Sequence, residues 1–230
     1  MIEISNLSKH FFIGEKRIDV LRELSLNIKK DKITVILGRS GCGKTTLLRL
    51  IAGLESVSQG EIKFKEQAKI GFVFQEPRLM PFLNVYENIV FPLKKNEIEP
   101  EKIGSLISMI GLSDFKFAAV SQLSGGMSSR VSLARVLAYE ANLILMDEPF
   151  AALDAFTRAS MQAEILKIQA GKTILFVTHN IDEALFLADE IILLEKGGIK
   201  SNYELSNLAR PRDLLSEELI AIKRKILSEI

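Results

Sequence analysis

One stretch of the sequence has the residue types and spacing needed to bind phosphate groups. It matches the pattern G-x-x-x-x-G-K-[ST] at every fixed position and reads Gly38-Arg39-Ser40-Gly41-Cys42-Gly43-Lys44-Thr45. Its glycines can adopt backbone angles that turn successive N–H groups inward around an anion. Lys44 adds a compact positive charge for the β- and γ-phosphates, and the Thr45 hydroxyl is a hard oxygen ligand for Mg²⁺. These residues predict a binding site for a nucleoside triphosphate.

The residues on either side of this loop predict the elements that hold it. The apolar residues 33–37 are typical of a short buried strand, and residues 46–52 favour a helix. The loop then lies at a helix N-terminus, where the helix dipole adds positive potential. The same setting, close to Lys44, can lower the pKa of the Cys42 thiol. A small spacer residue with an ordinary thiol is the alternative interpretation of Cys42.

Polar residues also stand where three other apolar stretches end, at Gln75, Asp147-Glu148 and His179. Ligands bind at the carboxyl ends of strands in open α/β sheets, so these positions are candidates for the same site. Gln75 offers an oxygen to Mg²⁺ or a water, and Asp147 suits a contact with Mg²⁺. Glu148 can polarise an attacking water, and His179 can donate to a γ-phosphate oxygen. A solvated loop start and an ordinary loop histidine are the alternatives.

Residues 76–140 differ in character from the rest of the chain and predict a helical insertion. Four prolines divide the stretch, and residues 84–91 and 101–110 favour short helices. The stretch ends in Ser124-Gly125-Gly126, followed by a helical pattern to about Tyr139. Ser124 can cap that helix. Whether these residues form a second anion site or only a glycine-containing cap stays open on local grounds.

The first 28 residues predict strands at residues 3–4 and 20–28 with a turn at residues 14–17. Phe11 and Phe12 are expected in the loop before that turn. One of them could stack on an adenine ring, because a flat apolar face suits a purine; packing at a sheet edge is the alternative.

The composition limits the possible functions of the chain. Lys and Arg number 30 against 29 Asp and Glu, so the net charge is +1 and there is no global field to attract nucleic acid. No apolar run has the length of a membrane span, and the first residues do not resemble a secretory leader. A single cysteine excludes an internal disulfide and suits a reducing cytosol.

Together these pieces resemble the ATP-binding subunit of an ABC transporter, over essentially the whole chain. Residues 38–45 match the phosphate loop of that family, Gln75 its Q-loop glutamine, and residues 123–126 its signature. Asp147-Glu148 match the Walker B aspartate and catalytic glutamate, residues 152–154 the D-loop, and His179 the switch histidine. Phe11 falls where the family places its adenine-stacking aromatic residue.

The resemblance implies an α/β fold: a phosphate-loop NTPase core of the ABC ATPase type with an antiparallel β subdomain and a helical insertion. The core and β subdomain are expected in residues 1–75 and 141–230, and the helical subdomain with the signature in residues 76–140, all within one ATPase domain.

The resemblance further implies that two copies meet head to tail with ATP between them. ATP is expected to contact one copy through Phe11, Gly38, Arg39, Ser40, Gly41, Cys42, Gly43, Lys44, Thr45 and Thr46. The second copy is expected to contribute Ser124, Gly125, Gly126 and Asp154. Glu148, His179 and Gln75 are the expected catalytic residues, and Mg²⁺ is expected on Thr45, Gln75 and, through water, Asp147.

Residues 75–81, 150–158 and 209–213, and Met127 in the signature, look like those of the nitrate, sulfonate and taurine importers. Ser128-Ser129 depart from the residues often found there. The implied partners are an integral-membrane permease and, indirectly, an extracytoplasmic solute-binding protein. The implied location is the cytoplasmic face of the membrane, as a peripheral subunit. A soluble ABC ATPase, an exporter ATPase subunit and a small-molecule kinase are the alternatives.

Overall fold

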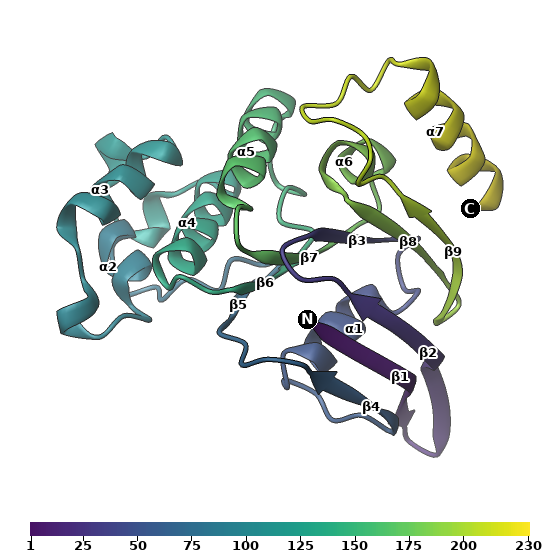
Figure 1. Cartoon of the computed structure of the whole chain (residues 1–230). Coiled ribbons are helices and arrows are strands. Elements are labelled where there is room, and N and C mark those ends of the chain that lie inside the picture. The colour runs from purple at the N-terminus through teal and green to yellow at the C-terminus, as the bar shows by residue number, and fades with distance from the viewer. The chain divides into compact units, whose positions relative to one another are not determined.

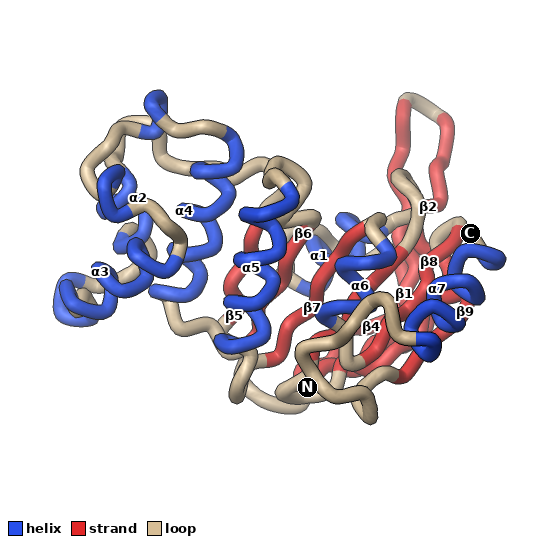
Figure 2. The backbone as a smooth tube through the Cα atoms, turned by 90° about the horizontal axis from the view of Figure 1, so that it is seen from above, coloured by secondary structure: helices blue, strands red, loops and turns tan.

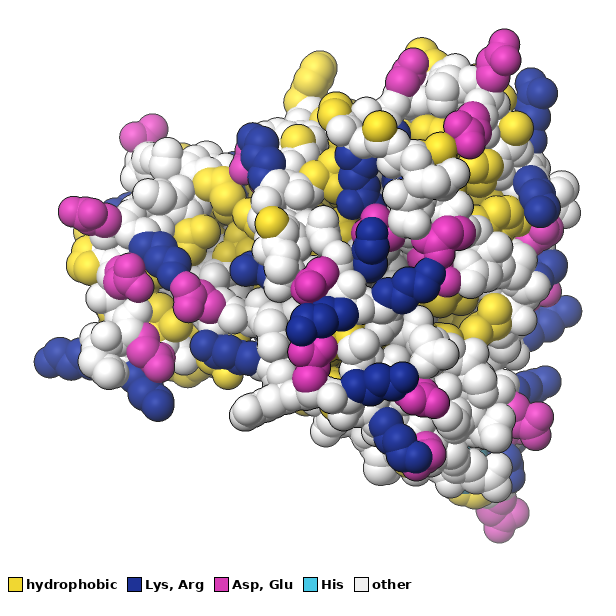
Figure 3. Space-filling view, viewed as in Figure 1, with side chains coloured by type: hydrophobic (Ala, Val, Ile, Leu, Met, Phe, Trp, Pro, Cys, Tyr) yellow, Lys and Arg dark blue, Asp and Glu magenta, His cyan; other side chains and the backbone are white.

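The computed structural model describes residues 1–230 (Figure 1). Most apolar stretches of the sequence lie in buried strands. Contacts group the chain into two units, one of residues 1–68 and 169–230 and the other of residues 69–168. None of the helices combines the length and the apolar character needed to cross a membrane. Charged side chains of both signs are interspersed over the face shown in Figure 3, as a net charge of +1 suggests.

The first unit contains a three-stranded antiparallel sheet that forms the expected β subdomain. Its strands in spatial order are β2 (Lys16–Ile28), β1 (Ile2–Ile13) and β4 (Gln59–Phe64). The expectation that Phe11 and Phe12 lie in a loop is wrong, because both belong to β1, where Phe11 is paired with Ile18. Both aromatic side chains and Ile13 are exposed, so the far end of the hairpin shows no alternation of buried and exposed positions. In Figure 2 this end of the hairpin extends beyond the rest of its sheet, near the label β2.

A second group of four strands in this unit is mostly parallel. In spatial order they are β7 (Thr173–Thr178), β3 (Ile33–Leu37), β8 (Glu190–Glu195) and β9 (Gly198–Glu204). β3 pairs in parallel with both β7 and β8. β3 and β7 are buried along their whole length, as expected of parallel strands. β9 returns antiparallel to β8. The helices of the unit are α1 (Lys44–Ile51) and α6 (Ile181–Leu187), which pack on these strands, and α7 (Glu217–Glu229), which packs on α6.

The second unit combines two parallel strands with the helical stretch. The strands are β5 (Ile70–Val73) and β6 (Leu143–Asp147), and the helices are α2 (Val85–Val90), α3 (Pro100–Met109), α4 (Gly125–Ala138) and α5 (Ala155–Ile168). Helix α4 is central, because it contacts α2, α3 and β5. Gly71 permits the close approach to β5, since a Cβ there would lie 2.4 Å from a methyl carbon of Val136.

The helix starts in this unit follow from their first residues. Asn84 accepts a hydrogen bond from the Glu87 amide while the Glu87 carboxylate accepts one from the Asn84 amide, which forms a capping box for α2. Pro100 opens α3, where its missing N–H is not needed. The Ser124 hydroxyl accepts a hydrogen bond from the Met127 amide at 3.2 Å and caps α4, as the sequence predicts.

Candidate functional site

The phosphate loop connects β3 to α1, the elements that the sequence predicts. Gly41 and Gly43 have φ angles of +81° and +107°, which other residues rarely adopt, and Gly43 immediately precedes the helix. At Gly38 a Cβ would lie 2.4 Å from the Leu194 carbonyl oxygen of β8, so the strand leaves no space for a side chain. The loop backbone is therefore shaped by its glycines and leads directly into the N-terminus of α1, where the helix dipole favours an anion.

The Lys44 side chain is only 5% exposed, and its ammonium lies against the loop. Its Nζ donates to the Gly38 carbonyl at 2.8 Å and to the Arg39 carbonyl at 3.1 Å. The positive charge of Lys44 is thus held at the loop that precedes the N-terminus of α1. This arrangement can bind the phosphates of a nucleotide.

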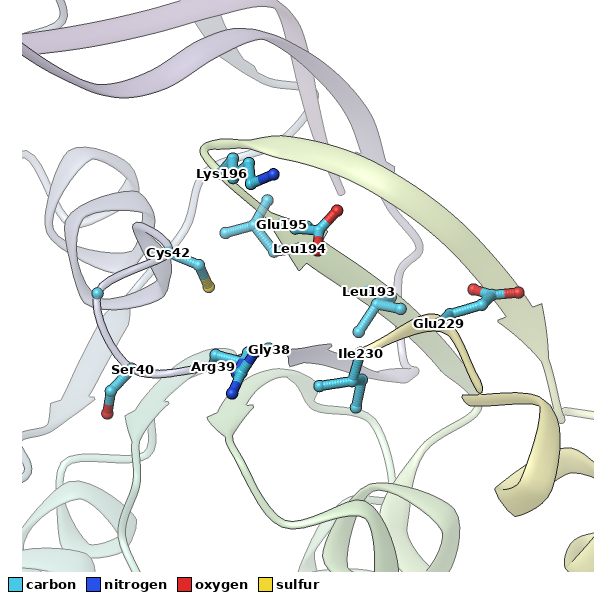
Figure 4. Close-up of a pocket in the computed structure, with 11 residues that line it drawn as sticks. Gly38, Arg39, Ser40, Cys42, Leu193, Leu194, Glu195, Lys196, Glu229 and Ile230 are labelled. Atoms are coloured by element: carbon cyan, nitrogen blue, oxygen red, sulfur yellow. The ribbon is translucent and has the colours of Figure 1, made fainter. Parts of the chain in front are cut away.

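Burial reverses the expected effect of the loop on Cys42. The residue lines a cavity of about 240 Å³ between the loop, the end of β8 and residues 229–230 (Figure 4). Burial raises the pKa of the Cys42 thiol, and the nearby charge of Lys44 only partly offsets this effect. The expectation of a lowered thiol pKa is therefore wrong, because packing against β8 removes solvent that the loop alone would leave.

The β1–β2 hairpin packs directly on the phosphate loop and carries Phe11. A Cβ on Gly43 would lie 2.7 Å from a methyl carbon of Leu21 and 2.9 Å from the Val20 carbonyl oxygen. Phe11 lies further along the same hairpin and is 37% exposed, whereas Phe12 is 65% exposed and makes an edge contact with His10. The hairpin that carries Phe11 thus packs on the phosphate loop within one unit.

Lys9 is a residue of this region that the sequence did not single out. It is 7% exposed, and its ammonium lies 4.6 Å from the centre of the Phe11 ring. The only sequence signal is a lysine two positions before an aromatic residue, because residues at this spacing lie on the same face of a strand.

His179 follows the last residue of β7 and is exposed at the start of α6. Thr178 and Asn180 hold the chain on either side of it. The Thr178 hydroxyl donates to Glu183 at 2.7 Å and accepts from the Asn180 amide at 3.0 Å. The Asn180 side chain accepts from the first amides of α6 and caps the helix.

The other end of α6 is held by two arginines of the segment 209–213. Arg212 donates to the carbonyls of Leu185 and Ala188 at 2.8 and 2.6 Å, and Arg210 donates to the Leu187 carbonyl at 2.5 Å. Burial lowers the pKa of Arg212 to about 10. The sequence marked this segment only through its resemblance to one group of importers, and its contact with the helix after His179 emerges from the structure.

The second unit carries the two acids. Asp147 is the last residue of β6 and is 4% exposed, whereas Glu148 is half-buried. Glu148 has a φ angle of +45°, and its carbonyl accepts a hydrogen bond from the Ala151 amide at 3.1 Å. The chain therefore turns sharply at Glu148, a type of backbone strain that often accompanies functional sites.

The signature and the D-loop lie together in this unit. A Cβ on Gly126 would lie 3.2 Å from the Ala152 carbonyl oxygen and from a methyl carbon of Leu153. Asp154 accepts hydrogen bonds from the amides of Phe156 and Thr157 and from the Thr157 hydroxyl, so it caps α5. The Thr157 hydroxyl bond is the main cause that lowers the pKa of Asp154. The signature glycines thus lie against the D-loop residues that precede Asp154.

Gln75 lies two residues beyond β5 and is exposed. The chain that follows it is fixed by Arg135 of α4, which donates to the carbonyls of Pro77 and Arg78, each at 3.1 Å. Helix α4 begins at the signature, so one helix contacts both the signature turn and the chain after Gln75. The sequence did not single out Arg135, because arginines in helices are usually exposed.

The chain matches proteins of a known family along its whole length. The sequence model described as ABC transporter matches residues 21–151. An uncharacterized ABC transporter ATP-binding protein of Methanocaldococcus jannaschii is 42% identical, with 99% of this chain and 90% of that protein covered. The chain belongs to the ABC transporter ATP-binding proteins.

Two further relatives of this ABC ATPase differ in what their names say they transport. An aliphatic sulfonates import ATP-binding protein of Bacillus cereus is 39% identical over 99% of this chain and 95% of that protein. A spermidine/putrescine import ATP-binding protein of Bacteroides fragilis is also 39% identical, over 100% of this chain and 51% of that protein.

A solved structure matches the fold of this ABC ATPase. The ATP-binding cassette MJ0796, as a dimer in a post-hydrolysis state bound to ADP and Pi, superimposes with a TM-score of 0.83. It is 33% identical, and the match covers 89% of this chain and 99% of that chain. The predicted fold, ATP binding and ATPase activity are confirmed by these likenesses.

Proposed function

We propose that the chain couples ATP hydrolysis to the import of an alkanesulfonate, or a related small solute such as taurine or nitrate, through a separate membrane permease. The observation that carries this proposal is the likeness of nearly the whole chain to an aliphatic sulfonates import ATP-binding protein. The equal identity to a spermidine/putrescine import protein makes polyamine import the second candidate.

In this proposal ATP binds along the hairpin and the phosphate loop of the first unit. The adenine stacks on Phe11, which belongs to the same hairpin whose residues Val20 and Leu21 pack against Gly43. The amides of residues 38–46 bind the phosphates. Lys44 exchanges its hydrogen bonds with the Gly38 and Arg39 carbonyls for bonds with phosphate oxygens, so its charge stays at the loop when the nucleotide enters.

Thr45, Gln75 and Asp147 are the residues proposed to hold Mg²⁺, with Asp147 acting through water. Their donor atoms are a hydroxyl, an amide carbonyl and a carboxylate, all hard oxygens of the kind that Mg²⁺ prefers. The structure contains no cluster of three or more His, Cys, Asp or Glu residues that could form a cage. Single oxygen ligands suit Mg²⁺, which retains waters and binds phosphate oxygens. When bound, the ion would neutralise part of the phosphate charge.

Glu148 and His179 are proposed to act on the hydrolysis itself. Glu148 accepts a proton from the attacking water, whose oxygen bonds to the γ-phosphorus while the bond to the bridging oxygen breaks. ADP and inorganic phosphate are the products. His179 donates to a γ-phosphate oxygen and keeps it in line, with its position set by the caps at Thr178 and Asn180.

A second copy is proposed to complete the site. Ser124, Gly125, Gly126 and Asp154 of that copy face the ATP bound to the first. Two observations support this: all four residues belong to one unit, in which Gly125 and Gly126 lie against residues 152–153, and a solved cassette 33% identical to this chain is dimeric. ATP then bridges the copies, and its hydrolysis removes the bridging charge so that they separate.

The helical subdomain, residues 76–140, is proposed to transmit this separation to the permease at the cytoplasmic face of the membrane. It exposes several aromatic side chains, which are Phe82, Phe91, Phe115 and Phe117. Aromatic residues are enriched at protein interfaces. A solute-binding protein on the other side of the membrane would deliver the cargo.

The Glu148→Gln variant tests the proposed function. We expect it to bind ATP and to hydrolyse it about 10²-fold more slowly or worse, because it lacks the general base. With Mg-ATP it should retain a polytopic permease from detergent-solubilised membranes of the source cell, whereas Lys44→Ala, which cannot hold the phosphates, should not.

The companion binding protein is then titrated with an alkanesulfonate, taurine, nitrate and spermidine. Binding of spermidine alone would move the assignment to polyamine import. Retention of soluble proteins only, in several mild detergents, would favour an ABC ATPase that works without a permease.

A further inference from the structure

Phe11 has a buried positive charge beneath one face of its ring. The Lys9 ammonium lies 4.6 Å from the ring centre, within the range of a cation–π interaction. Lys9 is 7% exposed, whereas Phe11 is 37% exposed. The two residues are two positions apart in β1 and so lie on one face of the strand. The inner face of the ring is covered by Lys9, and an outer part of the residue remains accessible.

The ammonium that supports the ring is itself fixed to the chain that follows α1. Its Nζ donates to the Ser56 carbonyl at 2.8 Å and lies 3.5 Å from the Glu55 carboxylate. The neighbouring Ser58 amide donates to the Ser8 carbonyl at 3.0 Å, and its hydroxyl accepts from the His10 amide at 3.2 Å. This segment connects α1 to β4, so Lys9 ties the aromatic ring to the chain that follows the helix of the phosphate loop.

We infer that Lys9 is a positioning residue for the nucleotide base: it presents the outer face of Phe11 to a purine. The ring is held before the nucleotide arrives, so less side-chain freedom is lost on binding. The covered inner face leaves one side for stacking, and the cation draws electron density from the ring, which favours an electron-rich base on the opposite side. This inference rests on the proposed stacking of adenine on Phe11.

Calorimetric titrations with Mg-ADP and with Mg-pyrophosphate separate this role from a general effect on the fold. ADP is used because its binding requires no second copy in the proposed mechanism, and pyrophosphate contacts the loop but has no base. Lys9→Gln removes the charge and retains a donor for the Ser56 carbonyl. We expect it to weaken ADP binding about three- to tenfold, by analogy with desolvated cation–π contacts, and to leave pyrophosphate binding unchanged. Lys9→Arg should retain most of the ADP affinity.

A double-mutant cycle with Phe11→Ala shows whether Lys9 acts through the ring. Phe11→Ala should weaken ADP binding, and adding Lys9→Gln should then cause no further loss. Phe12→Ala is the matched control, because Phe12 is the next residue, is more exposed and is not the ring that Lys9 supports. It should leave ADP binding unchanged.

Equal losses for ADP and pyrophosphate, or a Lys9→Gln loss that persists without the ring, would overturn the inference. A full ADP affinity in Lys9→Gln together with a loss in Phe11→Ala would overturn it while leaving Phe11 as the adenine platform. An unchanged ADP affinity in Phe11→Ala would refute the platform itself.

Discussion

Ser124 has two roles that different substitutions can separate. Its hydroxyl caps α4 through the Met127 amide at 3.2 Å, and it is also proposed to contact the ATP held by a second copy. An N-cap Ser→Ala substitution costs about 1 kcal/mol, whereas Ser→Gly costs only a few tenths. We therefore expect Ser124→Ala to lower the free energy of unfolding by about 1 kcal/mol, or about 2–4 °C in melting temperature for a chain of this size. Ser124→Gly should melt almost like the parent.

Hydrolysis should respond differently, because both variants lack the hydroxyl. Removing one donor to the charge that develops in a transition state typically costs about 10²-fold or more in kcat. We expect both variants to lose hydrolysis to this extent, although only one is destabilised. Thermal unfolding without nucleotide and phosphate release with Mg-ATP measure the two effects. Ser128→Ala is the control: it lies in the first turns of the same helix, and both stability and turnover should be retained.

Two results would refute the reasoning. Hydrolysis at the parental rate by Ser124→Gly would mean that the hydroxyl does not contact the phosphate. Equal melting temperatures for Ser124→Ala and Ser124→Gly, both near the parental value, would mean that the cap contributes little to α4.

Three further outcomes are expected. Gly126→Ala should fold and bind ADP but lose ATP hydrolysis, because its Cβ would lie 3.2 Å from the Ala152 carbonyl oxygen of the D-loop. Phosphate release measures this loss, and turnover at the parental rate would contradict the close contact. Arg212→Met should lower the free energy of unfolding, measured in urea, by about 2–4 kcal/mol, because three carbonyls lose a charged donor and removal of the buried charge offsets only part of this loss. Arg212→Lys should lower the free energy of unfolding by less. Burial raises the pKa of the Cys42 thiol, so less thiolate is present at neutral pH than for free cysteine. Alkylation by iodoacetamide, followed by mass spectrometry, should therefore be slower at pH 7 than that of free cysteine and should accelerate as the pH rises, with ADP protecting; rapid alkylation at pH 7 would contradict this.

The local features of the candidate site could be predicted from the sequence because they depend on residues close together in the chain. The phosphate loop lies between β3 and α1, since apolar residues form the strand and glycines allow the turn. Ser124 caps α4 because the hydroxyl reaches an amide three residues later. The expected placement of His179 at a strand end follows from the same kind of short-range pattern.

Contacts between distant segments were decided only by the tertiary structure. Phe11 belongs to a strand because the hairpin pairs it with Ile18, although both faces of that end are exposed and no alternation marks it. The Cys42 thiol has a raised pKa because the loop packs against β8, some 150 positions later in the chain, and loses solvent there. Lys9, Arg135 and Arg212 gain their roles from carbonyl groups or rings on other segments. A sequence pattern shows which groups a chain carries, whereas burial and hydrogen-bond partners depend on how the chain packs, and this packing sets their charge and position.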